Sequence, residues 1–206
     1  VICIFDEVIT GFRWSPGGFQ ALHNIIPDIT TVGKIVTGGM AGGAVGGRAE
    51  IMEVMNMTGD SQHDRLDRAQ HGGTFNANAI TAAAGIATLK IVATGEPQRK
   101  ADHVAQSIRA GFDEVLEERG ANAVVHGDSS AFHVYFGARS TNGLGAKEIK
   151  GMPGDVMRAY RQGLQMRGID LMSRAGGLTS MMHTDEDIQK TIVGFGLTID
   201  EMIEIT

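Results

Sequence analysis

The chain has 206 residues, 42% of them hydrophobic and 20% charged, which is enough to bury a sizeable core in one or two domains. Its formal net charge is −6 at pH 7. Together with the lack of a long basic run, this argues against nucleic acid and anionic membranes as partners and favours small molecules. No segment reaches the roughly 20 apolar residues that span a bilayer, and no signal-peptide pattern opens the chain. We therefore expect a cytoplasmic protein.

Neither disulfide nor metal chemistry is indicated by the sequence. Cys3 is the single cysteine, so an intrachain disulfide cannot form, and its apolar neighbours predict that it is buried. None of the seven histidines shows a spacing suited to zinc. We expect no metal.

Residues 1–95 predict an α/β arrangement. The apolar run Val1–Phe5 predicts a buried strand, and because it starts without methionine or a preceding turn, we expect a protein cut in the middle of a sheet. Ile29–Val32 predicts a second buried strand, with Lys34 just after it. Between these two strands we expect a short helix at 19–23. After Lys34 we expect a packed turn and strand within 38–47, a helix at 48–55, a polar surface loop at 57–70 and a helix at 79–92. The polar loop either shields a site or is only solvated.

Residues 96–206 predict a small α+β domain, and Gly95-Glu-Pro97 marks the change. Apolar residues at helical spacing predict its helices, and short β-rich runs predict its strands. We expect a helix at 98–119, strands at 123–126 and 131–136, a loop at 137–154, a helix at 155–167, a strand at 169–172 and a helix from 184 to about 203.

Lys34 and Asp6 carry the most informative chemistry. Lys34 follows a strand, and open α/β sheets gather their ligands at the carboxyl ends of strands. A lysine amine attacks a carbonyl once desolvation or nearby positive charge has freed it of its proton. Pyridoxal phosphate serves as an electron sink while an aspartate keeps its ring nitrogen protonated. Asp6 and Lys34 supply one group of each kind.

Four sequence motifs that occur in a fixed order support a functional role for Asp6 and Lys34. They are Asp6-Glu-Val-Ile-Thr-Gly-Phe-Arg13, Pro27-Asp-Ile-Thr-Thr-Val-Gly-Lys34, Gly38-Gly-Met-Ala-Gly-Gly-Ala-Val-Gly-Gly-Arg48 and His71-Gly-Gly-Thr-Phe-Asn-Ala-Asn78. With them the chain resembles the class III pyridoxal phosphate-dependent aminotransferases, in the branch that includes glutamate-1-semialdehyde aminomutase. The resemblance covers nearly the whole chain and is strongest over residues 1–90.

The resemblance implies the C-terminal half of an aspartate aminotransferase-like, fold type I enzyme. Residues 1–95 would be the remainder of a large pyridoxal phosphate-binding domain with a mostly parallel sheet, and 96–206 the small α+β domain. Asp6 would hold the pyridine nitrogen, Val8 would pack against the ring, and Lys34 would form the internal aldimine. Thr74 would reach the cofactor phosphate of the neighbouring subunit, which implies a homodimer. The rest of the sheet, the phosphate loop and the stacking aromatic residue would belong to an N-terminal half.

Each assignment has a structural alternative. Asp6 could cap a strand end, Val8 could be a core residue, Lys34 a solvated loop lysine, and Thr74 a turn or helix-capping residue. Their joint occurrence at these spacings favours the functional interpretation.

The substrate is left open by the sequence. The aminomutase branch predicts a glutamate before the strand that leads to His183, but the chain has Ser173-Arg-Ala-Gly-Gly-Leu178. Arg174 could bind a substrate carboxylate with its planar fork, or could be a surface arginine. The main hypothesis is amino-group transfer of the aminomutase type. The alternatives are an ω-amine or β-amino-acid transaminase that releases a keto product, and an inactive fragment that keeps only the dimer-forming half.

Overall fold

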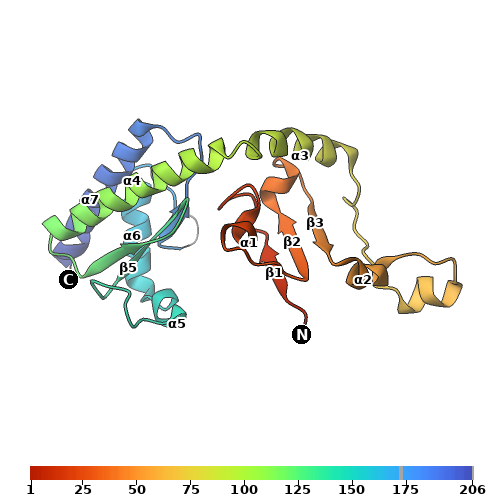
Figure 1. Ribbon diagram of the computed structural model, residues 1–206. Helices are drawn as coiled ribbons and strands as arrows, with labels where there is room; N and C mark the ends of the chain where they lie inside the picture. The colour runs from red at the N-terminus through yellow and green to blue at the C-terminus, as the bar shows by residue number, and fades with distance from the viewer. Residues whose placement is uncertain (172–173, 206) are drawn as a thin grey trace. The chain divides into compact units, whose positions relative to one another are not determined.

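The structure is a computed structural model that describes residues 1–171 and 174–205. Its chain divides into two compact units, Val1–Glu96 and Pro97–Thr206, which Figure 1 colours from red through yellow and from green through blue. Within the described residues, no single helix is long and apolar enough to cross a membrane. Two consecutive helices, 79–92 and 96–118, pass that test only when taken together across a bend.

The first unit is built on a three-stranded sheet of order β1-β2-β3. Strand β1 (Ile4–Glu7) runs parallel to β2 (Ile29–Gly33), and β3 (Gly43–Gly47) runs antiparallel to β2. Helix α1 (Gly18–Leu22) lies in the connection from β1 to β2 (Figure 1). Because β1 and β2 are parallel, their carboxyl ends lie at the same edge of the sheet.

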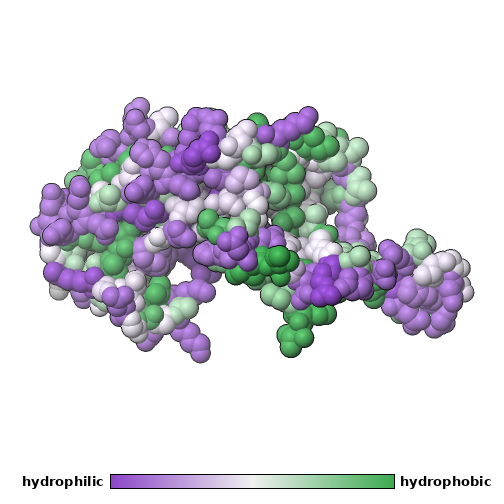
Figure 2. Space-filling view, in the orientation of Figure 1, coloured by the Kyte–Doolittle hydropathy of each residue, from purple (hydrophilic) through white to green (hydrophobic). Residues whose placement is uncertain are grey.

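The start of the chain differs from the sequence prediction. The strand begins at Ile4 instead of Val1, and Val1, Ile2 and Ile4 are exposed, as is Cys3. The physical reason is the position of β1 at the edge of its sheet, where β2 is its one strand neighbour in the described structure. Figure 2 shows the resulting apolar surface at the N-terminal end of the chain.

Helix α3 (Ala79–Val92) packs closely on the 3₁₀ helix η1 (Lys34–Thr37) that follows β2. Glycines make this approach possible on both sides. A Cβ on Gly38 would lie 2.5 Å from the carbonyl oxygen of Ala84, and one on Gly85 would lie 2.6 Å from that of Val36. The segment between β3 and α3 holds α2 (Ala49–Met52), η2 (Glu53–Met55) and the π-helix η3 (His63–Asp67).

The second unit packs long helices on a small antiparallel sheet of order β4-β5-β6. The strands are β4 (Ala123–His126), β5 (Ala131–Phe136) and β6 (Gly176–Leu178). The helices are α4 (Glu96–Glu118), α5 (Ala146–Lys150), α6 (Gly154–Met166) and α7 (Asp185–Ile205). Their core centres on aromatic rings: those of Phe112 and Phe195 stack with centroids 3.7 Å apart.

The third strand of this sheet lies later in the chain than predicted. Residues 169–171 form no strand, Met172 lies outside the described residues, and β6 is at Gly176–Leu178. Glycine decides the placement, because β6 approaches β5 so closely that a Cβ on Gly176 would lie 2.2 Å from the carbonyl oxygen of Phe132. Glycine-rich strands carry little propensity signal, so the sequence pattern favoured the apolar run before them.

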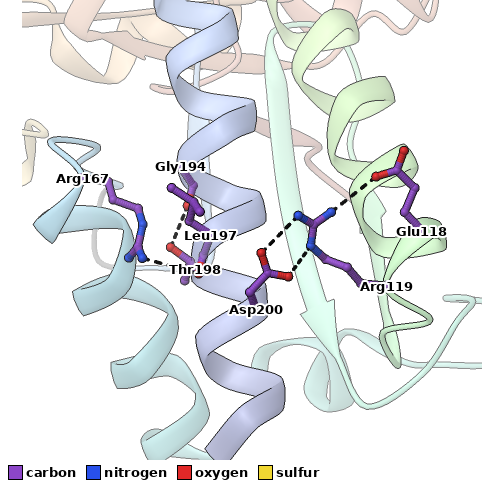
Figure 3. Close-up of polar contacts among 7 residues, drawn as sticks. All are labelled: Glu118, Arg119, Arg167, Gly194, Leu197, Thr198 and Asp200. Carbon is purple, nitrogen blue, oxygen red and sulfur yellow. Dashed lines mark hydrogen bonds and ion pairs between the residues drawn. The ribbon is translucent and has the colours of Figure 1, made fainter.

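Ion pairs fix α7 to its neighbours in this unit. Arg119 binds the carboxylate of Asp200 through Nε at 2.6 Å and through its terminal nitrogen at 3.2 Å (Figure 3). Arg167, just after α6, binds Glu201 at 2.7 Å and reaches the carbonyl oxygen of Leu197 at 3.4 Å. The forked geometry of these arginine contacts holds α7 to the C-terminal ends of α4 and α6.

Candidate active site

The strand register of the first unit brings three predicted site residues together. Asp6 pairs with Thr31 across β1 and β2, and both Val8 and Lys34 come directly after the strand ends. The methyl groups of Val8 lie beside Gly33, where a Cβ would be 3.4 Å from Val8 Cγ1. Asp6, Val8 and Lys34 therefore lie at one edge of the parallel pair, the edge where α/β proteins bind ligands.

Asp6 is held in place by one of its carboxylate oxygens. Oδ1 accepts hydrogen bonds from the backbone N–H of Val8 at 3.0 Å and from Thr31 Oγ1 at 3.3 Å. Among the described residues, Oδ2 has no hydrogen-bond donor. A carboxylate with one anchored and one available oxygen can accept a further hydrogen bond from a cationic ring N–H.

Lys34 has an unusual backbone that sequence reasoning missed. Its φ is 51°, in the left-handed region where residues other than glycine and asparagine are uncommon. Thr37 Oγ1 lies 2.9 Å from the Lys34 carbonyl oxygen and 2.6 Å from that of Met40. The Lys34 ammonium is exposed and has no ion pair or hydrogen bond with the described residues. Strained backbone of this kind concentrates at functional sites.

Glu7 is a second residue that the sequence analysis overlooked. Its side chain is 1% exposed and accepts hydrogen bonds from the backbone N–H groups of Phe19 at 3.0 Å and Gln20 at 2.8 Å, and from Thr10 Oγ1. Gly18 makes room for it, with φ of 74° and a virtual Cβ 2.7 Å from Glu7 Oε1. Glu7 thereby fixes the loop that starts at Val8. The signal was the Glu7-x-x-Thr10 spacing, which suits a local turn contact.

Thr74 lies in an exposed turn at residues 74–77, before α3. The turn is closed by a hydrogen bond from Asn76 Nδ2 to the carbonyl oxygen of His71 at 2.9 Å, and Asn78 caps α3 by accepting from Ile80 N at 2.9 Å. Residues of this segment line a cavity of about 530 Å³ together with η1, β3 and α3. Thr74 is not part of that lining.

Arg174 belongs to the second unit and is exposed two residues before β6. Among the described residues it forms no ion pair with an aspartate or glutamate. The pKa of the His133 imidazole on β5 is lowered first by burial, then by the neighbouring His126, and least by the positive charge of Arg174.

The residues of the first unit fit pyridoxal phosphate in two respects. Lys34 Nζ is available at the strand edge, and Asp6 Oδ2 is available at the end of the neighbouring strand. These are the amine and carboxylate that the cofactor requires. Among the described residues, no cluster of three or more potential metal ligands occurs.

Comparisons with known proteins agree with this geometry. The aminotransferase class-III family model matches residues 1–132. Glutamate-1-semialdehyde 2,1-aminomutase of Archaeoglobus fulgidus is 35% identical over 194 residues, which are 93% of this chain and 44% of that protein. The chain thus spans less than half the length of the curated relatives that it matches.

Solved structures give the same answer. An omega-transaminase from Sphaerobacter thermophilus is 33% identical with a TM-score of 0.79, covering 97% of this chain and 44% of that one. A β-phenylalanine aminotransferase from Variovorax paradoxus is 28% identical with a TM-score of 0.80, covering 99% and 45%. The chain therefore belongs to the class-III aminotransferase family and has the fold of the C-terminal part of a type I pyridoxal phosphate-dependent transferase.

Proposed function

We propose that the protein transfers amino groups with pyridoxal phosphate, which is attached covalently to Lys34. The observation that carries this proposal is the pairing of an available lysine amine with an available Asp6 oxygen at adjoining ends of two parallel strands. In this proposal Val8 packs against one face of the cofactor ring. The family membership of the chain supports all three roles.

The bound cofactor would supply an electron sink for the carbon that carries the amino group. This chain's own residues do the rest. Asp6 would accept a hydrogen bond from the ring nitrogen and so hold the proton there. Lys34 Nζ takes the proton from the amino-bearing carbon of the substrate and returns it at the acceptor carbon, as general base and then general acid. Val8 and Gly33 shape the apolar wall beside these groups.

The proposal includes a homodimer in the cytoplasm. Thr74 would donate its hydroxyl to the cofactor phosphate in the neighbouring subunit's site, which suits its exposed turn. Residues 1–95 would be the remainder of the cofactor domain, and 96–206 the small domain that carries Arg174. Arg174 would bind a substrate carboxylate, which suits a guanidinium that has no acidic partner among the described residues.

The reaction is of the aminomutase type in the main proposal, because the curated relative from Archaeoglobus is an aminomutase. Two observations favour the transaminase alternative. Arg174 stands in the segment where the resemblance predicts a glutamate, and the solved neighbours at 33% and 28% identity are transaminases. The two reactions differ in whether one substrate or two are needed.

Kinetics on the longest form of the protein that its gene encodes tests both points. The Lys34→Ala variant should abolish turnover, and retained turnover would contradict the proposed mechanism. Glutamate 1-semialdehyde given alone should yield 5-aminolevulinate if the protein is an aminomutase. A requirement for a separate keto acceptor, with release of a keto product, would identify a transaminase instead. Lys90→Ala, on the exposed side of α3, is the matched control.

A further inference from the structure

Glu7 is the last residue of β1 and stands between two residues of the proposed cofactor site. Its neighbours Asp6 and Val8 are joined by the hydrogen bond from the Val8 N–H to Asp6 Oδ1. Side chains of successive strand residues point to opposite faces of a sheet. Asp6 is accordingly exposed, whereas Glu7 is buried with its carboxylate bound to the backbone of α1.

The hydrogen bonds of Glu7 join three parts of the chain. Oε2 accepts from the Phe19 N–H at 3.0 Å and from Thr10 Oγ1. Oε1 accepts from the Gln20 N–H at 2.8 Å. The backbone carbonyl oxygen of Glu7 accepts from the Gly11 N–H at 2.9 Å. Glu7 therefore ties the end of β1 to the loop at 8–17 and to α1, through its side chain and its backbone.

The space around Glu7 is closed by backbone. A Cβ on Gly18, whose φ is 74°, would lie 2.7 Å from Glu7 Oε1 and 2.9 Å from Oε2. A Cβ on Gly11 would lie 2.6 Å from the Glu7 carbonyl oxygen and 3.2 Å from Glu7 Cβ. Because main chain surrounds Glu7 on both sides, the residue cannot shift without moving the loop or the strand end.

A shift of Glu7 reaches the site through Val8. The Val8 N–H, at 3.0 Å, is the closer of the two donors to Asp6 Oδ1, and Thr31 Oγ1, at 3.3 Å, is the other. These contacts leave Asp6 Oδ2 available and set its direction. Movement of the main chain at position 7 would displace the Val8 N–H and its side chain together, and would leave the Asp6 carboxylate with the longer contact to Thr31.

We propose that Glu7 is a positioning residue for the cofactor, which aims Asp6 Oδ2 at the ring nitrogen and holds Val8 against the ring. Glu7 itself would touch neither cofactor nor substrate. This inference rests on the proposed function and extends it to a residue outside the contact shell of the cofactor. The rival interpretation is that Glu7 only stabilises the first unit, without any effect on how the cofactor is held.

Glu7→Gln tests the proposal in the longest form of the protein that its gene encodes. Glutamine has nearly the same size, but it offers one acceptor oxygen where the carboxylate offers two, and its NH₂ group would face a backbone N–H. The concentration of pyridoxal phosphate that half-saturates the protein should rise about tenfold, since a buried hydrogen bond to the carboxylate is lost.

The visible absorption of the lysine-bound cofactor gives a readout that stability alone does not change. A proton on the ring nitrogen places positive charge near the Lys34 nitrogen and so disfavours a further proton there. Misplacing Asp6 weakens that ring charge, so the pH midpoint of the absorption change should rise. We expect a rise of about one unit in Glu7→Gln and a larger rise in Asp6→Asn.

Thr10 offers a second route to the same effect. Thr10→Val removes the hydroxyl that donates to Glu7 Oε2 and keeps the shape of the side chain. It should shift the pH midpoint and the half-saturating concentration in the same direction as Glu7→Gln. Thr10→Ser keeps the donor and should restore wild-type values. This pair tests the proposal even if Glu7→Gln fails to fold.

Asp28→Asn is the matched control for a merely structural effect. Asp28 accepts from the Cys3 N–H at 2.7 Å and from Arg48 at 2.9 Å, at the amino ends of the same two strands. Its loss should lower the unfolding temperature while the pH midpoint and the half-saturating concentration stay at wild-type values. Wild-type values in Glu7→Gln and Thr10→Val, or changes no larger than those of Asp28→Asn, would overturn the proposal.

Failure of this inference is distinguishable from failure of the proposed function. Pyridoxal phosphate attached at Lys34 of the wild type, mapped after reduction, is the reference for every comparison. Attachment in the wild type with no shift in the Glu7 and Thr10 variants overturns the positioning role alone. Absence of attachment in the wild type overturns the proposed function itself.

Discussion

Lys34 adopts a backbone conformation that lysine disfavours, with φ of 51°. The left-handed region costs an L-residue about 1 kcal/mol or more, whereas glycine enters it freely. The turn that follows β2 holds this conformation through the contacts of Thr37 with two carbonyl oxygens. The strain sits at the residue to which the proposed chemistry assigns the central role.

Glycine at position 34 should therefore be more stable than alanine. We expect Lys34→Gly to exceed Lys34→Ala in free energy of unfolding by about 1 kcal/mol, with neither variant active. Denaturant titration measures the difference. Lys90 in helix α3 is the matched control, because there alanine should exceed glycine by about 1 kcal/mol. Equal stability of the two Lys34 variants would contradict the claim that the backbone of Lys34 is strained.

Tyr160 buries its hydroxyl without a hydrogen-bond partner among the described residues. The side chain is fully buried between the rings of Phe136 and Phe195, and burial raises its pKa. Removing an unsatisfied buried hydroxyl relieves its desolvation cost, so Tyr160→Phe should stabilise the protein by about 1 kcal/mol. Thermal unfolding measures this. Tyr135→Phe, at a half-buried site, should change stability by less than about 0.5 kcal/mol. A destabilised Tyr160→Phe would show that the hydroxyl has a partner.

At the scale of elements, the close contact of α3 with η1 positions Lys34. Gly85 faces the backbone of Val36, and its virtual Cβ lies 2.6 Å from a carbonyl oxygen that cannot move without shifting the 3₁₀ helix. Gly38 approaches the backbone of Ala84 in α3, and Gly85 approaches the backbone of Val36 in η1. These two contacts hold the turn of Lys34 against α3.

Gly85→Ala should push η1 away from α3. We expect a loss of about 1–3 kcal/mol in stability, despite the better helix propensity of alanine, together with reduced cofactor attachment at Lys34. Gly46→Ala on β3 is the control, because its virtual Cβ meets no atom within 4 Å. The interpretation fails if the two variants behave alike in thermal unfolding and in attachment.

Periodicity predicted three of the four helices of the second unit, and it missed the short α5, which lies within the predicted loop at 137–154. The expected helices at 98–119, 155–167 and 184–203 correspond to α4, α6 and α7 within about two residues at each end, because their apolar residues repeat at helical spacing. Strand β6 escaped prediction because two of its three residues are glycine. The exposure of the first strand and of Cys3 was not predicted, and within the described residues β2 is the one strand that pairs with β1.

At the scale of the whole molecule, the order of four motifs, more than any single residue, led to the prediction of the site. Asp6, Val8 and Lys34 were predicted from their sequence context, and the structure gathers them at one sheet edge. Glu7 and the His126–His133 pair were missed because their roles depend on tertiary burial and strand register, which no local pattern encodes. The roles of all five residues, Asp6, Val8, Lys34, Thr74 and Arg174, are proposals.

The half-buried pair of His126 and His133, whose rings are hydrogen-bonded to each other, should shape the acid stability of the protein. The folded-state pKa of His133 is lowered from 6.5 to about 4. Its contribution to stability is thus fully present above pH 6.5 and is lost as pH falls from 6.5 towards 4, because the unfolded state binds the proton first. His133→Phe should flatten the unfolding temperature over this interval. Asp28 and Asp187, whose pKa values are lowered chiefly by backbone hydrogen bonds, act only at still lower pH. An unchanged pH dependence of the unfolding temperature in His133→Phe would contradict the lowered pKa of His133.

The most direct test of the central claim is the site of cofactor attachment. The longest form of the protein that its gene encodes is incubated with pyridoxal phosphate, reduced with borohydride and digested, and its peptides are mapped by mass spectrometry. We predict modification confined to Lys34 and absent from Lys34→Ala. Scattered modification of exposed lysines, or none in the folded protein, would contradict the account.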